Sequence, residues 1–171
     1  MAVIQDSYPL APKSRTYLQA GQYWSIALSS GRYAAGVVVA VPNAEQAPDL
    51  PTGLKNFVAG VLDWSGDSEP VDEDLAGAEL LNWGGAHVKM ITLDDGLILG
   101  RVDRQLNQIS MLSHWMGGTV WCYSNGVRTG PASQERKREL PIMGVWGFRF
   151  ARVLAESQFV RGLDIRARRT D

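Results

Sequence analysis

Alternating apolar and polar positions predict a chain built mainly of β-strands that are joined by tight turns. The clearest strand is 23–28, in which every second residue is apolar, as a strand with one buried face requires. Gly31 supplies a tight turn, and the β-branched stretch 32–41 returns as a buried strand. Gly36 inside that stretch indicates a bulge or a close approach of the backbone to a neighbour. These positions predict a β-hairpin near the start of the chain.

The same reasoning predicts more strands further along the chain. An apolar stretch at 57–64 is expected to form a third strand, and 144–154 the last one. The core residues expected from that last strand are Val145, Phe148 and Phe150. Dipeptides that favour positive φ predict two further hairpins. The first joins strands 87–93 and 97–102 through a turn at Asp95-Gly96. The second joins strands 119–124 and 127–129 through a turn at Asn125-Gly126.

Helices are expected at only two places. Residues 70–81 suit a short helix, because proline and acidic side chains are favoured in a first turn. Residues 131–140 suit a short exposed helix, because most of their side chains are polar. The tripeptide Trp83-Gly84-Gly85 is expected to break the chain between elements. The predicted fold class is α+β and mainly antiparallel β, with a curved sheet or a partly open barrel and one or two short helices.

Length and composition fit one globular domain. The chain has 171 residues, of which 45% are hydrophobic, so it is long enough to bury roughly 70% of its unfolded surface. We expect an N-terminal arm over 1–20, a single mainly β domain over 21–160 and a basic, frayed tail over 161–171. The start shows no signal-peptide pattern, and the longest apolar run, 34–41, is too short to span a bilayer. With a single cysteine, these features predict a cytoplasmic protein that does not contact a membrane.

Charge is distributed unevenly although the net charge is only −1. Residues 1–127 hold 7 basic against 13 acidic side chains, whereas residues 128–171 hold 10 against 5. Charges of one sign gathered within a Debye length, about 8–10 Å, act together on a charged partner. The acidic excess concentrates at 63–79 and the basic excess at the C-terminal end. Each is therefore either an ordinary solvated face or part of a docking surface.

Residue patterns that carry catalysis or bind cofactors are absent or weak. No phosphate-binding glycine loop is present, and one cysteine with two histidines cannot complete a zinc site without carboxylates. Cys122 with His114 is the one conceivable nucleophile and base, but a strand cysteine between two aromatic residues is more often a small apolar side chain. Basic and aromatic residues do not interleave as nucleic-acid binding requires. We expect no enzymatic activity, no cofactor, no metal and no nucleic-acid partner.

The strongest candidate surface is the acidic stretch between 63 and 79. Carboxylates on a binding surface speed the encounter with a cationic partner and add specificity, and tryptophan is a frequent interface anchor. The predicted partner-binding residues are Asp63, Trp64, Asp67, Glu69, Asp72, Glu73 and Asp74.

The predicted first hairpin carries a family resemblance. The series begins with Gly21, an aromatic residue two positions on and an apolar strand. It continues with the Gly31 turn and a returning strand that holds an aromatic residue and Gly-x-Val. This series resembles the start of bacterial immunity protein 26 domains. The stretch 81–83 is the possible counterpart of a tryptophan-bearing segment of that family. Ala27 stands where the family often has proline, and residues after 127 do not align.

The resemblance implies a small cytoplasmic protein that binds the catalytic domain of a cognate secreted bacterial toxin and blocks it. It names neither the toxin's activity nor a set of binding residues. A toxin that cuts nucleic acid needs a cationic cleft, which the acidic stretch would complement. The alternative is a non-catalytic, β-rich binding or structural module of another kind, for example a phage or assembly component. The oligomeric state is open in both cases.

Overall fold

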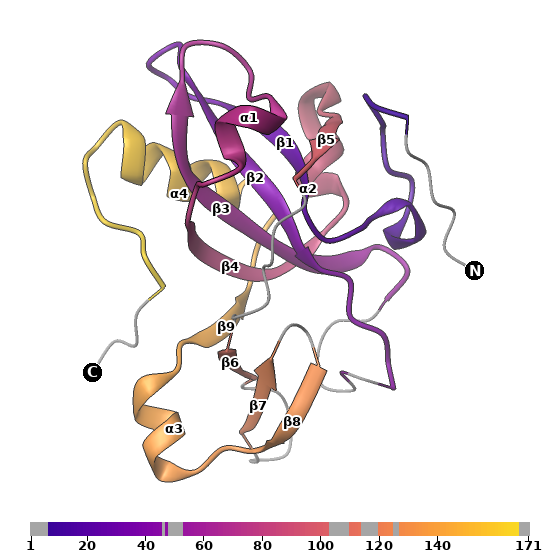
Figure 1. Ribbon diagram of the computed structural model, residues 1–171, viewed down its shortest axis with the longest axis vertical. Coiled ribbons are helices and arrows are strands. Elements are labelled where there is room, and N and C mark those ends of the chain that lie inside the picture. The colour runs from indigo at the N-terminus through magenta and orange to yellow at the C-terminus, as the bar shows by residue number, and fades with distance from the viewer. Residues whose placement is uncertain are drawn as a thin grey trace.

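The computed structural model describes residues 7–45, 47, 53–102, 110–113, 120–124 and 127–167. Nine strands within these ranges form one sheet (Figure 1). They are β1 (Gln22–Ala27), β2 (Tyr33–Ala40), β3 (Asn56–Gly66), β4 (Leu80–His87), β5 (Ile98–Arg101), β6 (Ser110–Ser113), β7 (Trp121–Ser124), β8 (Val127–Pro131) and β9 (Ile142–Val145).

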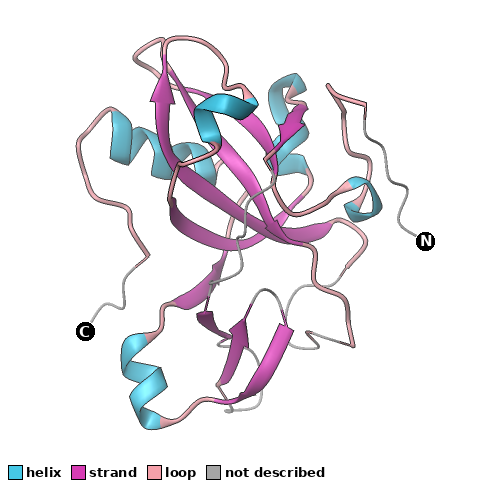
Figure 2. Cartoon of the chain, in the orientation of Figure 1, coloured by secondary structure: helices cyan, strands magenta, loops and turns pink. Residues whose placement is uncertain are grey.

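Short helices surround the sheet (Figure 2). The α-helices are α1 (Asp72–Leu75), α2 (Lys89–Thr92), α3 (Gln134–Glu139) and α4 (Phe150–Phe159). Two 3₁₀ turns are η1 (Arg15–Tyr17) and η2 (Leu93–Asp95). No helix in the described part of the chain is long and apolar enough to cross a membrane.

The strands follow the order β5-β1-β2-β3-β4-β9-β6-β7-β8. All neighbours are antiparallel except β9, which lies parallel to both β4 and β6. The sheet is curved and has two ends, so it is not a closed barrel (Figure 1). The α+β, mainly antiparallel fold class is confirmed, and of the two expected shapes the curved sheet is the one observed.

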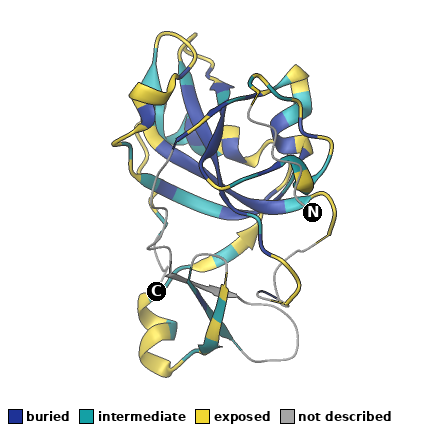
Figure 3. Cartoon of the chain, turned by 45° about the vertical axis from the view of Figure 1, so that its right-hand side comes forward, coloured by how far each residue is buried: buried dark blue, intermediate teal, exposed yellow. Residues whose placement is uncertain are grey.

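The central strands are covered on both faces. Burial in β2 is nearly continuous, and its residues alternate between two apolar clusters because successive side chains point to opposite faces. One cluster is covered by α2, α4 and the chain end, and the other by α1. Buried residues accordingly concentrate in β1–β4, whereas α3 is exposed (Figure 3). This double cover makes β1–β4 the rigid part of the molecule.

The first hairpin forms as predicted. β1 pairs with β2 from Tyr23↔Val37 to Ala27↔Tyr33, and Gly31 takes a φ of 82° in the turn. The register of β2 against β3 shifts next to Gly36, and the Trp24 ring lies against the α-carbon of Gly36. Both the bulge and the close approach expected at Gly36 are therefore present.

The predicted hairpin of 87–93 with 97–102 is wrong. Residues 89–92 form α2, and β5 pairs with β1 instead. Val88 and Ile91, three residues apart, are both buried, a spacing that fits one helical turn better than a strand. The positive φ values fall on Asp94 and Asp95, at 58° and 61°, and not on Gly96.

The predicted last strand, 144–154, is also wrong. β9 ends at Val145, which is 72% exposed, and most of the remainder forms α4. The residues expected in the core, Val145, Phe148 and Phe150, are exposed, and Trp146, Ala151 and Ala155 are buried in their place. Ala151 and Ala155 are four residues apart, as one face of a helix requires.

Trp146 also explains why Trp83-Gly84-Gly85 is not the predicted break. These residues lie inside β4, and the Trp146 ring occupies the space beside Gly84 that a side chain would fill. The helix predicted at 70–81 is limited to α1, because Leu80 and Leu81 already belong to β4. The expected exposed helix at 131–140 is confirmed as α3, and the last hairpin as β7 and β8, although its turn residues lie outside the described ranges.

The end of the chain is packed and not frayed as far as residue 167. Ile165 is buried, and the Ala167 N–H donates to the Leu81 carbonyl at 2.7 Å. The Asn82 side-chain amide donates to the Ile165 carbonyl at 2.8 Å. At the other end, Leu10 forms a bridge with Ile98 at the outer side of β5, and Leu18 is buried.

The contact between Trp24 and Gly36 predicts that Gly36→Ala destabilises the protein. A β-carbon at Gly36 would lie 2.2 Å from the Trp24 ring, so the buried ring would have to move. We expect a loss of about 1–3 kcal/mol in the free energy of unfolding, measured by urea denaturation. Gly144→Ala in exposed β9, where a β-carbon meets nothing within 4 Å, is the matched control. Equal stability of the two variants would contradict this packing.

Candidate functional site

Residues 63–79, here called the acidic connection, join β3 to β4 and contain all seven predicted partner-binding residues. Asp63 and Trp64 lie at the end of β3, Asp67 and Glu69 in the following loop, and Asp72, Glu73 and Asp74 in α1. The structure thus brings the predicted set to one end of the sheet (Figure 1). Their surroundings, however, divide them into carboxylates that hold the structure and carboxylates that face solvent.

Asp72 fixes α1 to the sheet. The buried Tyr23 side chain donates its hydroxyl hydrogen to Asp72 Oδ1 at 2.5 Å. Burial, and then this hydrogen bond, raise the pKa of Tyr23 well above its ordinary value, so the tyrosine remains a donor at neutral pH. Gly100 lies directly beneath the pair and leaves no room for a side chain. Leu75, three residues on, is fully buried and completes the anchoring of α1.

Basic side chains from distant segments lie against other members of the acidic connection. Arg166, near the chain end, contacts Asp63 at 3.5 Å and Glu79 at 3.8 Å. Arg32, in the first hairpin turn, contacts Asp67 at 3.0 Å. All three ion pairs are solvent-exposed and contribute little stability. The two pairs of Arg166 show that part of the basic C-terminal region meets the acidic region within the same molecule.

Glu69 and Glu73 are exposed, and neither forms an ion pair with a described residue. Asp74 is also exposed and accepts a hydrogen bond from the Val71 N–H at 3.2 Å. Trp64 is half-buried against the cluster under α1, and its ring covers Gly66. The surface offered to solvent here is therefore mainly anionic and rests on a rigid base.

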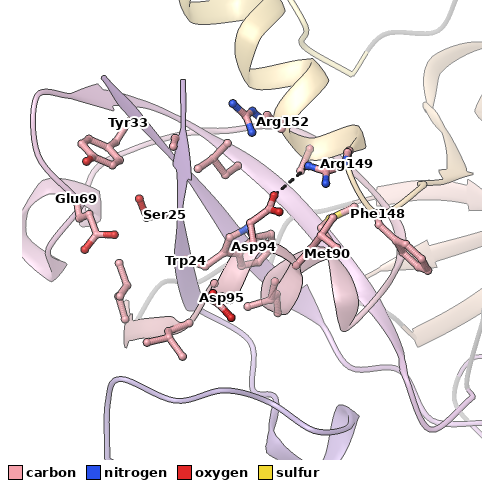
Figure 4. Close-up of a pocket in the computed structure, with 18 residues that line it drawn as sticks. Trp24, Ser25, Tyr33, Glu69, Met90, Asp94, Asp95, Phe148, Arg149 and Arg152 are labelled. Carbon is pink, nitrogen blue, oxygen red and sulfur yellow. Dashed lines mark hydrogen bonds and ion pairs between the residues drawn. The ribbon is translucent and has the colours of Figure 1, made fainter. Parts of the chain in front are cut away.

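Glu69 belongs as well to a pocket that the sequence did not reveal (Figure 4). The pocket encloses about 290 Å³ beside β1, between the start of β5, η2 and the beginning of α4. We call it the β1-edge pocket. Charged groups around it come from three segments far apart in sequence, namely Glu69, Asp94 with Asp95, and Arg149 with Arg152. Ile26, Ile91 and Leu97 are among its apolar walls.

The acidic pair of η2 forms one side of this pocket. Asp94 Oδ2 accepts from Arg149 at 2.9 Å, an ion pair that ties η2 to the residue before α4. The positive φ of both aspartates is a conformation in which short polar side chains are tolerated. The sequence predicted a turn at Asp95-Gly96, and because Glu69 lies far away along the chain, no local pattern placed these residues in one pocket.

One carboxylate links helix α4, whose Ala151 and Ala155 pack into the core, to the first hairpin. Glu156 accepts the Ser29 N–H at 2.5 Å and the Ser29 hydroxyl at 2.7 Å, which ties α4 to the turn of the first hairpin. The hydrogen bond from the Ser29 hydroxyl is the main cause that lowers the pKa of Glu156, with Arg152 and Arg161 adding to it. This contact sets where Arg149 and Arg152 lie relative to β1.

The remaining candidates for chemistry stay apart. His87 Nδ1 accepts the Lys89 N–H at 3.0 Å, and burial, Lys89 and Lys55 lower the pKa of His87. Cys122 is half-buried in β7, and His114 lies outside the described residues. No group of three or more His, Cys, Asp or Glu side chains within the described ranges is arranged to hold a metal ion.

Comparison with protein-family models, with curated proteins and with solved structures found no match.

The clamp on α4 predicts a pH-dependent effect of Glu156→Gln. Because the pKa of Glu156 is lowered in the folded protein, its carboxylate stabilises the fold above its ordinary pKa of 4.5, and this contribution disappears as the pH falls through the folded-state pKa. The stability difference between wild type and E156Q should be at most about 1 kcal/mol at pH 7, since the pair is exposed, and smaller at pH 3.

Urea denaturation at the two pH values measures this difference. Ser29→Ala, which removes the hydroxyl donor but keeps the backbone N–H, should reproduce part of it at pH 7. An E156Q difference that is the same at both pH values would show that the charge of Glu156 plays no part.

Proposed function

We propose that this protein is a non-catalytic binding protein that neutralises a cognate secreted bacterial toxin, in the cytoplasm of the cell that makes both, by covering the toxin's active site. The observation that carries the proposal is the acidic connection. It presents exposed carboxylates on an element that Tyr23, Asp72 and Leu75 fix to the most buried part of the sheet. A rigid surface loses little conformational entropy on binding, which favours tight inhibition.

The charge of this surface suggests the kind of toxin. Glu69, Glu73 and Asp74 face solvent together with Asp67, whose side chain is 93% exposed although it pairs with Arg32. A cleft that binds nucleic acid must be cationic to hold phosphates. An anionic inhibitor therefore associates faster with such a cleft and prefers it to uncharged surfaces. We therefore infer a toxin that acts on nucleic acid.

The first hairpin supports the class of protein. Its series of glycine and aromatic positions resembles the start of bacterial immunity protein 26 domains, and each glycine in it has a structural task here. Gly21 and Gly31 take positive φ, and Gly36 accommodates the Trp24 ring. The β-rich structural or assembly module is the competing candidate, and it predicts a stable homo-oligomer in place of a toxin complex.

Co-expression tests the proposal directly. The probe is the C-terminal domain of the protein encoded immediately upstream, placed under an inducible promoter in a heterologous bacterium. We expect this domain to stop growth and the present protein to restore it, with a 1:1 complex recovered by gel filtration. A toxic domain whose effect is unchanged, with no complex formed, would refute the proposal.

Charge reversal tests the proposed surface. Asp67→Lys/Glu73→Lys leaves the Tyr23–Asp72 contact intact, and we expect its association rate with the toxin domain at low salt to fall about tenfold. Glu135→Lys/Glu139→Lys on exposed α3 changes the same charge and is the matched control. Stopped-flow fluorescence at low and at physiological salt measures both rates. Equal rates for the two double variants would exclude the acidic connection as the docking surface.

A further inference from the structure

The edge of β1 beside the β1-edge pocket has no neighbouring strand among the described residues. β5 pairs only with Gln22, Tyr23 and Trp24, so Ser25–Ala27 extend beyond it. Leu28 N–H donates toward β2, to the Arg32 carbonyl, at 2.9 Å. Because N–H groups alternate in an antiparallel ladder, the N–H of Ala27 points away from β2 toward the pocket. An unpaired edge of this kind is a template for another extended segment.

The pocket lies on both sides of this edge. Figure 4 shows Ser25, Tyr33 and Glu69 gathered at one side and Asp94 with Arg149 at the other. Successive side chains of a strand point to opposite faces, so an added strand would place alternate residues in these two halves. The arrangement therefore suits an extended peptide better than a compact molecule.

The volume points in the same direction. Pockets for drug-sized ligands and cofactors measure about 300–1,000 Å³, and this one, at about 290 Å³, lies at the lower limit. Apolar walls from Ile91, Leu97 and Leu99 suit the methylene stem of one long side chain.

The charged groups that line the pocket indicate which kind of partner side chain would bind in it. Asp94 is already paired with Arg149, and Arg152 contributes to lowering the pKa of Glu156 on its own helix. Glu69 and Asp95 also line the pocket, and neither is in an ion pair with a described residue. Acceptors without donors are what a guanidinium or ammonium group would satisfy.

We propose that an extended segment of a partner protein adds to β1 beside Ser25–Ala27 and places an arginine or lysine side chain against Glu69. The main chain supplies affinity through the open edge, and the basic side chain supplies selectivity. This deepens the proposed function by naming the chemistry of the partner's segment, and it rests on that function only in assigning the segment to a toxin.

Peptides test the inference without any toxin. The probe is acetyl-Thr-Val-Arg-Val-Thr-amide, added to isotope-labelled protein and followed by amide chemical shifts. We expect shifts at Ser25–Ala27, Glu69 and Leu97, with a dissociation constant of about 1 mM, as a short strand with one anchor gives. The same peptide with glutamate in place of arginine, or with both valine nitrogens methylated, should bind at least fivefold more weakly.

Variants of the protein complete the test. Glu69→Gln should weaken the arginine peptide about fivefold, whereas Glu73→Gln, a matched exposed glutamate outside the pocket, should not. Shifts confined to another surface, or equal binding of the three peptides, would overturn the inference. If the peptide test fails and co-expression still restores growth, the proposed function stands without this site; if the peptide binds and growth is not restored, the site stands and the toxin assignment falls.

Discussion

Two tryptophan rings packed on glycine backbones hold this molecule together. Trp24 lies over Gly36 within the first hairpin, and Trp146 lies over Gly84 in β4. Each contact lets a large apolar ring approach the sheet at a distance that any side chain would prevent. Trp146 also stands between β9 and α4, so its packing on β4 brings the C-terminal helix onto the same face as Trp24. The position of α4 beside β4 follows from this second contact.

The candidate site depends on that placement. Once α4 lies beside the first hairpin, Glu156 reaches Ser29, and Arg149 reaches Asp94. These contacts hold η2 and the start of α4 next to β1, whose edge β5 leaves uncovered. On the opposite face, the buried Tyr23 hydroxyl holds Asp72 and with it the acidic connection. Glu69 lies where the two regions meet, so the exposed acidic loop adjoins the open strand edge.

Much of this fold could be predicted from local patterns. The first hairpin and β3 have apolar residues in the pattern that the sequence predicted for strands. In the structure their side chains pack into two apolar clusters on opposite faces of the sheet. The errors arose where an apolar stretch fits both the two-residue period of a strand and the 3.6-residue period of a helix. Residues 89–92 are helical because Ile91 packs against distant strands, and α4 is helical because Ala151 and Ala155 do so. The local alternation of apolar residues in 87–93 and 144–154 does not contain these contacts.

The candidate site was predictable only in part. The acidic stretch is contiguous in sequence, and composition alone marks it. The separation of its members into structural and exposed carboxylates depends on partners such as Tyr23, Arg32 and Arg166, which lie far away along the chain. The β1-edge pocket depends on an edge of β1 that β5 does not cover and on residues from five segments. No pattern within any one segment contains that information.

Hydrogen–deuterium exchange on the protein alone and in complex with the C-terminal domain of its upstream-encoded neighbour tests the central claim most directly. A partner bound as proposed slows exchange at the amides of Ser25–Ala27 and of the loop and α1 of the acidic connection, and leaves α3 and β8 unchanged. Slowed exchange confined to α3 and β8, or no complex at all, would contradict it.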